Sequence, residues 1–251
     1  MKRILLILGV LISIIAAHSV LAQVNEGVIT YDVKVNLHRR IPPEREQMKA
    51  RIPEFRNSKE QLFFTASESL SKPLIEDEDE EPMGGGGPGP RMRFQMPNTE
   101  TYFSQESGVM ITKQEFNGKE YLIDDSLKIA PWKFGTDIKT IQGYECKQAY
   151  YTDESIPDRK QEITAWYTDK IRPFLGPDRF NTLPGTILAL DINNGERVTV
   201  ASKVELRPLK KNELKAPTKG TKITRAEFRA MMEEQMKRMR ENGGGGMIIR
   251  N

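Results

Sequence analysis

The sequence predicts a mainly β fold, a β-rich α+β protein built on a single curved antiparallel sheet or half-barrel. Three observations support this: short segments alternate between apolar and polar residues, tight-turn residues separate them, and few segments have helical periodicity. We count roughly eight or nine strands, close to the size at which an open sheet curls. A short N-terminal helix and a C-terminal helix complete the prediction. Since so few helices can cover the sheet, curling is how it would bury its inner face.

The strands are expected in a regular succession. Residues 28–37 alternate with a period of two, as a half-buried strand does. Pro42 and Pro43 then begin a short helix over residues 44–51, because proline is tolerated in the first helical turn. Residues 131–134 are expected to form a linking segment at the sheet edge. The remaining strands are expected at residues 59–67, 101–104, 109–116, 119–124, 144–152, 162–168, 187–192 and 197–206.

Two of the expected connections are tight hairpin turns. Asn117-Gly118 separates one pair of strands, and Asn193-Asn194-Gly195 separates another. Asparagine and glycine accept the positive φ angles that such turns require, and Asn-Gly between two alternating segments is a strong hairpin signal. Successive strands joined in this way pair antiparallel, which argues against a βαβ arrangement.

The first 22 residues have the pattern of a secretory signal peptide. Lys2 and Arg3 precede an apolar run over residues 4–17, and small residues lead to Ala22, just before Gln23. The run is too short for a comfortable membrane span, and no later stretch is long enough for one. We therefore expect export across the inner membrane, to the periplasm or the cell surface or into the medium, with no membrane span after signal cleavage.

The mature chain divides into two parts. Residues 23–209 are expected to form the β-rich domain, with an acidic and glycine-rich insertion at residues 71–97. This insertion is expected to be disordered, since it buries too little apolar surface to offset its ordering entropy. Residues 210–251 are expected to contain a basic linker, a methionine-rich helix and a glycine-rich tail. Thr224 and Glu227 have the spacing of a helix N-terminal capping box.

Charge, histidine and cysteine counts exclude several classes of function. The 38 basic and 35 acidic residues give a net charge of +3, and loss of Lys2 and Arg3 with the signal peptide leaves +1. A chain so close to neutrality lacks the basic footprint of a nucleic-acid-binding protein. His38 is the only histidine after the signal, and Cys146 is the only cysteine. A zinc site made of histidine and cysteine cannot therefore form within one chain.

The stretch Leu175–Leu190, LGPDRFNTLPGTILAL, has the densest turn chemistry in the sequence. Gly176-Pro177 and Pro184-Gly185 each predict a reversal of the chain, since proline fixes φ and glycine accepts positive φ. The segments around these turns are apolar enough for the loop to pack against the sheet. We consider two interpretations, a structural plug over the end of the sheet and the lid or rim of a binding site.

This stretch and the segments before it resemble the GLPGLI family of exported proteins of the Bacteroidetes type. The six positions that correspond to the family's name are Thr182-Leu183-Pro184-Gly185-Thr186-Ile187, of which four match. Gly143–Ala149, Ala165–Tyr167 and Gly176-Pro177 also resemble family features, and the resemblance spans residues 27–208. It implies export and brings no established activity, cofactor or catalytic residue.

The sequence favours a non-enzymatic binding module. Its concave face would hold an apolar ligand, such as a lipid, or a partner peptide, and residues 175–190 would act as lid or rim. Each candidate is equally compatible with an ordinary core position. The ligand-binding candidates are Trp132, Trp166, Phe174, Phe180, Leu183, Pro184 and Gly185.

Two alternatives remain open at this stage. Methionines on one face of the C-terminal helix offer soft thioether ligands for copper as Cu(I), or an adaptable surface that docks on an envelope protein. These are Met232, Met236 and Met239. An enzyme of unknown class is the other alternative, although the neighbouring acids Asp124 and Asp125 point to opposite faces of a strand. Cys146 is expected either to be buried as a small apolar residue or to form a bridge between chains.

Overall fold

The structure, a computed structural model, describes residues 25–75, 98–156 and 159–241. The predicted signal peptide, residues 76–97 of the predicted insertion and the glycine-rich tail lie outside the described residues. Residues 71–75 of the expected insertion are described, and Ser71 to Leu74 belong to a strand. The prediction of an insertion beginning at Ser71 is therefore wrong at its N-terminal boundary.

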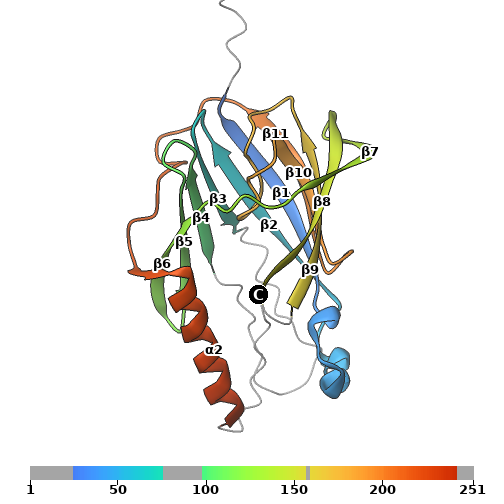
Figure 1. The fold of residues 1–251 in the computed structure, drawn as a ribbon, viewed down its shortest axis with the longest axis vertical. Coiled ribbons are helices and arrows are strands. Elements are labelled where there is room, and N and C mark those ends of the chain that lie inside the picture. The colour runs from blue at the N-terminus through green and yellow to red at the C-terminus, as the bar shows by residue number, and fades with distance from the viewer. Residues whose placement is uncertain (1–24, 76–97, 157–158, 242–251) are drawn as a thin grey trace, which may run out of the picture.

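The described residues form one twelve-stranded sheet in the order β12-β6-β5-β4-β3-β2-β1-β11-β10-β9-β8-β7 (Figure 1). Neighbouring strands pair antiparallel except β12 and β6, which are parallel. The predicted mainly β, antiparallel architecture is confirmed, whereas the predicted strand number was too low. The strands are β1 (Gly27–Asn36), β2 (Phe55–Phe64), β3 (Glu68–Leu74), β4 (Thr99–Ser104), β5 (Val109–Phe116), β6 (Lys119–Ser126), β7 (Lys133–Ile141), β8 (Tyr144–Ile156), β9 (Arg159–Thr168), β10 (Thr186–Ile192), β11 (Arg197–Leu206) and β12 (Thr221–Thr224).

The sequence analysis missed three strands, the interior strand β3 and two strands with weak alternation, β7 and β12. β7 was expected to be only a short linking segment, but it runs to Ile141 and is exposed over nearly its whole length. β12 has four residues and lies in the segment expected to be a linker. Both are edge strands of the sheet. An edge strand pairs on one side only and does not need a buried apolar face, so its sequence carries little periodic signal.

The hairpin turns have the predicted backbone conformation. Asn117 and Gly118 have φ angles of 52° and 72°, and the φ angles of residues 193–195 are positive as well. A further turn at Gln142-Gly143, with φ angles of 49° and 80°, joins β7 to β8. Positive φ at consecutive turn residues matches the twist of the flanking strands, which is why these connections are short.

The helices differ in how well the sequence predicts them. Helix α2 (Arg225–Glu241) begins with the expected capping box: the Glu227 N–H donates to Thr224 Oγ1, and the Thr224 N–H donates to the Glu227 carboxylate at 2.8 Å. The expected N-terminal helix is a 3₁₀ segment, η2 (Pro43–Arg51), preceded by η1 (His38–Arg40). Neither segment buries a residue. Ile41 and Met48 pack only partly buried against the core, and so little apolar contact does not stabilise a longer α-helix there.

The core is centred on β1, which lies in the interior of the sheet between β2 and β11. Ile29 and Tyr31 are wholly buried, and Val33 and Val35 follow on the same face. In Figure 1, β4–β6 lie on one side of the molecule and β8–β9 on the other, as their places near the two ends of the sheet order require.

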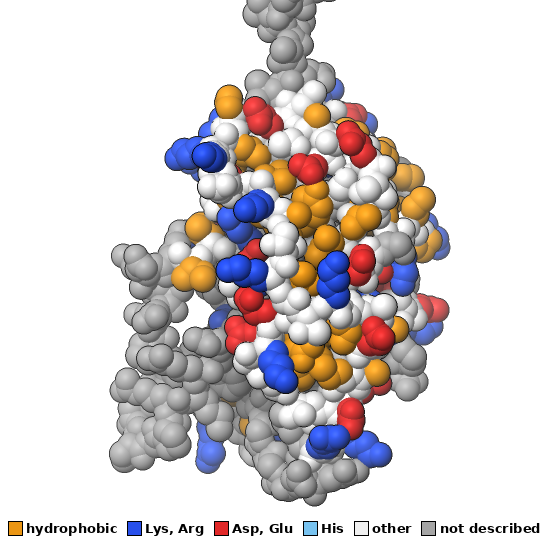
Figure 2. All heavy atoms as spheres, turned by 90° about the vertical axis from the view of Figure 1, so that its left-hand side faces the viewer, with side chains coloured by type: hydrophobic (Ala, Val, Ile, Leu, Met, Phe, Trp, Pro, Cys, Tyr) orange, Lys and Arg blue, Asp and Glu red, His pale blue; other side chains and the backbone are white. Residues whose placement is uncertain are grey.

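Figure 2 shows the side of the molecule on which β5 and β6 lie. Hydrophobic side chains occur there in small patches, and Lys or Arg alternates with Asp or Glu between them. This face therefore presents neither a large apolar patch nor a field of one sign of charge.

Candidate functional site

The connection between β9 and β10, residues 169–185, is the longest turn-rich segment among the described residues, and we call it the cover loop. Its contacts reach strands that are far apart in the sheet order. Asp178 contacts β2 and β3, whereas Arg179 contacts Asp153 on β8. Neighbouring strands are about 4.8 Å apart. One loop can therefore contact β2, β3 and β8 only if the sheet curls around it. The cover loop therefore lies on the concave face.

Backbone hydrogen bonds within and around the loop fix its shape. The Phe174 N–H donates to the Leu183 carbonyl at 3.0 Å, and the Ile187 N–H donates to the Leu175 carbonyl at 2.9 Å. Phe174 and Asp178 have φ angles of 57° and 55°, a region that non-glycine residues rarely occupy. The loop is thus held in one conformation by its own backbone and by the start of β10.

Three of the predicted ligand-binding residues come together beneath the loop. Phe180 and Leu183 are 5% and 0% exposed and belong to one apolar cluster, against which Trp132 packs. The Trp132 indole N–H donates to Thr182 Oγ1 at 2.8 Å, and its ring meets the Tyr151 ring edge-on at 4.6 Å. In this conformation these side chains fill the concave face, which agrees with the structural-plug interpretation.

The other predicted residues lie elsewhere. Trp166 is buried in a second cluster, and the Lys139 ammonium lies 4.0 Å from the centre of its ring. Phe174 is half-buried and Pro184 is exposed, whereas Gly185 is buried. A Cβ at Gly185 would lie 2.3 Å from the Thr168 carbonyl oxygen. The seven predicted residues therefore do not line one common pocket, and Gly185 is required by close packing.

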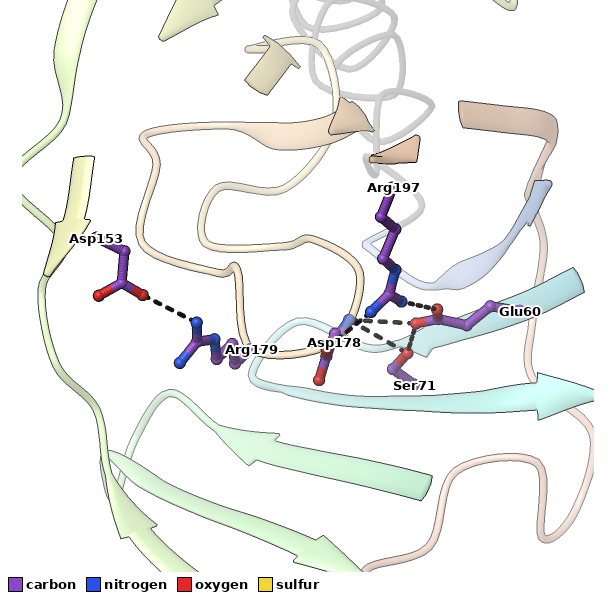
Figure 3. A network of polar contacts seen from close by, with 6 residues as sticks. All are labelled: Glu60, Ser71, Asp153, Asp178, Arg179 and Arg197. Carbon is purple, nitrogen blue, oxygen red and sulfur yellow. Dashed lines mark hydrogen bonds and ion pairs between the residues drawn. The ribbon is translucent and has the colours of Figure 1, made fainter. Parts of the chain in front are cut away.

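A polar network holds the tip of the cover loop, which is formed by Asp178 and Arg179 (Figure 3). The Glu60 carboxylate accepts hydrogen bonds from the Ser71 hydroxyl and, at 3.2 Å, from the Asp178 N–H. The Arg197 guanidinium lies 3.6 Å from both the Glu60 and the Asp178 carboxylates. Burial raises the pKa of Glu60 above its ordinary range, although the positive charge of Arg197 partly opposes this. The two acids and the arginine thus fasten the loop to β2, β3 and β11.

A second arginine lies at the base of the loop. Arg172 is 8% exposed, and its Nη1 donates to the carbonyls of Thr65 and Glu68 at 2.6 and 3.3 Å. These carbonyls belong to the turn between β2 and β3. Burial lowers the pKa of Arg172 to about 10. The Thr186 hydroxyl donates to the Arg172 carbonyl at 2.6 Å and so fixes the backbone of this residue as well.

The concave face contains buried polar atoms that have no partner. Within the described part of the chain, all such side-chain atoms come from the cover loop or from β11: Arg172 Nε and Nη2, Asn181 Oδ1, Arg197 Nε and Thr199 Oγ1. Native proteins pair the great majority of their buried polar groups, so each exception needs an explanation. The contact between the cover loop and the sheet is therefore the part of the core whose polar groups are least satisfied.

Sequence reasoning missed the two arginines. Arg172 follows Ile171 and precedes Pro173-Phe174, so a charge lies within an apolar stretch of the loop. Charged side chains are almost never fully buried unless they are paired. Such a charge amid apolar residues is the signal that could have marked Arg172 as a candidate. Arg197 gives no comparable signal, because polar residues precede it.

The predicted metal-binding residues remain untested. Met232 is half-buried on α2, while the side chains of Met236 and Met239 lie outside what the structure describes. Among the described residues, no group of three or more His, Cys, Asp or Glu side chains is placed to hold a metal ion. Copper binding by the methionines, and docking of this helix on an envelope protein, stay predictions.

Helix α2 rests on the β5–β6 hairpin through few side chains. The Phe228 ring meets the rings of Phe116 and Tyr121 edge-on at 6.0 and 5.5 Å. Beside this contact lies a groove of about 240 Å³, lined by Phe116, Asn117, Lys119, Tyr121, Met231, Glu234, Gln235 and Arg238.

Cys146 is a buried free thiol, which confirms the first of the two predicted environments. Burial raises the pKa of this thiol to about 11. The thiol is therefore protonated at neutral pH and is a weak nucleophile.

In the described ranges, no helix has the length and apolarity needed to cross a membrane.

The fold resembles that of PNGF-II, whose structures have been solved in the P21 and C2 space groups. The TM-scores are 0.53 and 0.54 at 15% and 16% sequence identity, and the matches cover 84% and 83% of this chain. They cover 34% and 33% of PNGF-II, so the chain spans about a third of that protein. At this identity the likeness shows the fold alone. No family model and no curated protein matches the chain, and membership of the GLPGLI family stays a prediction.

Proposed function

We propose that the chain is an exported, non-enzymatic binding module whose binding site is the concave face under the cover loop. The observation that carries this proposal is the confinement of unpartnered buried polar atoms to the contact between the loop and the sheet. Such atoms destabilise the closed state, since a buried polar group without a partner costs about 1–3 kcal/mol. A ligand that satisfies them would favour an open or rearranged loop.

The charged tip and the apolar side chains of the cover loop suit this role in different ways. Its tip is fastened by ion pairs at the surface, such as Arg179 with Asp153, and pairs of this kind contribute about 0–1 kcal/mol each. The apolar side chains of the cover loop, Phe180 and Leu183, occupy the place that an apolar ligand would take. Exchange of these side chains for a ligand of similar apolar area changes the free energy of burial little. The loop would thus act as a cover that a ligand displaces.

The chemistry of the concave face supports binding over catalysis. Glu60 and Asp178 lie near each other on this face, and both carboxylates are held by Arg197. The Ser71 hydroxyl and a backbone N–H use further acceptor positions of Glu60. These acids fasten the loop and are not directed at an open space where a substrate would lie.

Native mass spectrometry of the full chain, purified without denaturant or detergent, tests the proposal. We expect a bound small apolar molecule, and we expect its release to alter hydrogen exchange at the amides of Phe174, Phe180 and Ile187. These amides donate to carbonyl oxygens of the cover loop in its closed conformation. Bare protein from several expression hosts, together with unchanged exchange when long-chain acids or alcohols are added, would contradict a ligand site here.

A partner peptide is the second candidate, and the edge strand β7 favours it. Phe134 and Ile138 on β7 are 59% and 60% exposed, although both are large and apolar. β7 pairs with β8 on one side only, so its other side offers backbone donors and acceptors to an added strand. A synthetic peptide with alternating apolar and polar residues should bind with an affinity that Ile138→Asp lowers and Ile129→Asp, at an exposed residue before the strand, leaves unchanged. Equal binding by both variants would exclude β7.

A further inference from the structure

We propose that Arg172 binds the carboxylate of the ligand, so that the ligand is an amphiphilic acid, a carboxyl group on an apolar chain. This inference rests on the proposed binding function and names its substrate class. It starts from which nitrogens of the guanidinium are occupied. Nη1 donates to two carbonyl oxygens, whereas Nε and Nη2 have no partner.

The two unpartnered nitrogens form one recognition edge. In a planar guanidinium, the Nε–H bond and one Nη2–H bond are parallel and lie on the same side, away from Nη1. This pair matches the two oxygens of a carboxylate in a bidentate arrangement. The β2–β3 turn fixes the other end of the group through the Thr65 and Glu68 carbonyls. Arg172 is therefore oriented in advance with its side-on donor pair free.

Arg197 has a different environment and does not offer such a pair. Its Nη1 and Nη2 lie 3.6 Å from the Asp178 and Glu60 carboxylates, and only its Nε lacks a partner. The charge of Arg197 is thus neutralised by two acids. The contacts of Arg172 within the described residues are to neutral carbonyl oxygens, so its charge is not neutralised in the same way. A buried, uncompensated charge is costly, and an anionic ligand would remove that cost.

The surroundings of Arg172 favour an acid with an apolar chain over a bare anion. Ile171 and Leu175, close to it in the loop, are both buried in the cluster that contains Tyr31 and Phe64. A phosphate carries more acceptor atoms than one donor pair can satisfy and would leave them against apolar side chains. A carboxylate has two oxygens for two donors, and its chain would lie among the buried apolar side chains under the cover loop.

The full chain should be titrated with four probes, and tryptophan fluorescence and calorimetry should report binding. The probes are hexadecanoate below its aggregation concentration, hexadecanol, acetate and inorganic phosphate. We expect hexadecanoate to bind at least tenfold more tightly than hexadecanol, and acetate and phosphate to bind weakly or not at all. Equal binding of the acid and the alcohol would overturn the role of Arg172 but leave the apolar site intact. Binding of neither would overturn the proposed apolar ligand as well, and phosphate as tight as the acid would indicate a simple oxyanion site.

Variants at Arg172 separate recognition from folding. Arg172→Gln should abolish the preference for the acid, and Arg172→Lys, which keeps the charge without the planar donor pair, should reduce the preference at least tenfold. Lys170→Gln is the matched control, because Lys170 is a largely exposed cation on the same loop. Thermal unfolding identifies a variant that fails to fold, in which case Arg172→Lys alone decides the question. Full retention of acid preference in a folded Arg172→Lys protein would contradict the proposal.

Discussion

The base and the tip of the cover loop are held by opposite physical means. At the base, Leu183 is fully buried and Arg172 nearly so, and two nitrogens of Arg172 lack partners. At the tip, Asp178 and Arg179 reach solvent, yet each has a partner of opposite charge. The base is therefore stabilised mainly by burial with incomplete hydrogen bonding, and the tip mainly by ion pairs between its charged side chains and the sheet. This difference implies that a ligand acts on the base, while salt and pH act on the tip.

The largest effect is expected for Leu183→Ala at the base. Leu183 is wholly buried, so truncation leaves a cavity and should lower the free energy of unfolding by about 2–5 kcal/mol. Denaturant unfolding measures this loss. The neighbouring Pro184→Ala is the control, since Pro184 is exposed and its replacement should change stability by about 0.5 kcal/mol or less. A loss below about 1 kcal/mol for Leu183→Ala would show that the base is not packed in solution.

Gly185→Ala tests the same base through backbone packing. The added Cβ would lie 2.3 Å from the Thr168 carbonyl oxygen and 2.8 Å from Tyr167 Cδ2. The backbone oxygen cannot move without disturbing the pairing of β9 with β10, so a destabilisation of about 1–3 kcal/mol is expected. Thermal unfolding measures it. If Gly185→Ala has the stability of the original chain, the loop enters β10 along a different path.

Glu60→Gln changes the tip in a way that depends on pH. Because the folded-state pKa of Glu60 is raised above its ordinary value of 4.5, the protein binds this proton more tightly when folded. The contribution of Glu60 to stability is therefore fully present below pH 4.5 and is lost as the pH rises through the raised pKa. The original chain should lose stability relative to Glu60→Gln over that rise, as chemical unfolding at a series of pH values measures. An opposite slope would mean that pairing with Arg197 outweighs burial.

The contrast between base and tip also explains what the sequence could predict. Short-range features were predicted correctly, because a few neighbouring residues determine them. Asn117-Gly118 forms its hairpin turn, and Thr224 and Glu227 form their capping box. The burial of Phe180 and Leu183 follows equally from their apolar character. For these two residues, however, the same apolar character suits a core position and a ligand site, so burial alone did not identify the function.

The tip network could not be predicted, since its members come from distant segments. Glu60, Asp178 and Arg197 lie on β2, the cover loop and β11, and only the sheet order brings them together. Each is an ordinary surface-type residue in its own segment. The edge strands were missed for a different reason, because β7 and β12 pair on one side and have no buried face to impose alternation on their sequences.

The smallest effect is expected at the outer ion pair of the tip, Arg179 with Asp153. Their atoms are 2.9 Å apart, but the Arg179 side chain is 40% exposed, so solvent screens the attraction. A double-mutant cycle with Arg179→Ala and Asp153→Ala should give a coupling of about 0.2–1 kcal/mol that shrinks as salt is added. Because the pair joins the loop to β8, loss of it should also speed hydrogen exchange at the Phe180 amide without altering the amides of β1. A coupling that is large and insensitive to salt would place the pair in a buried environment, and the tip would then resemble the base.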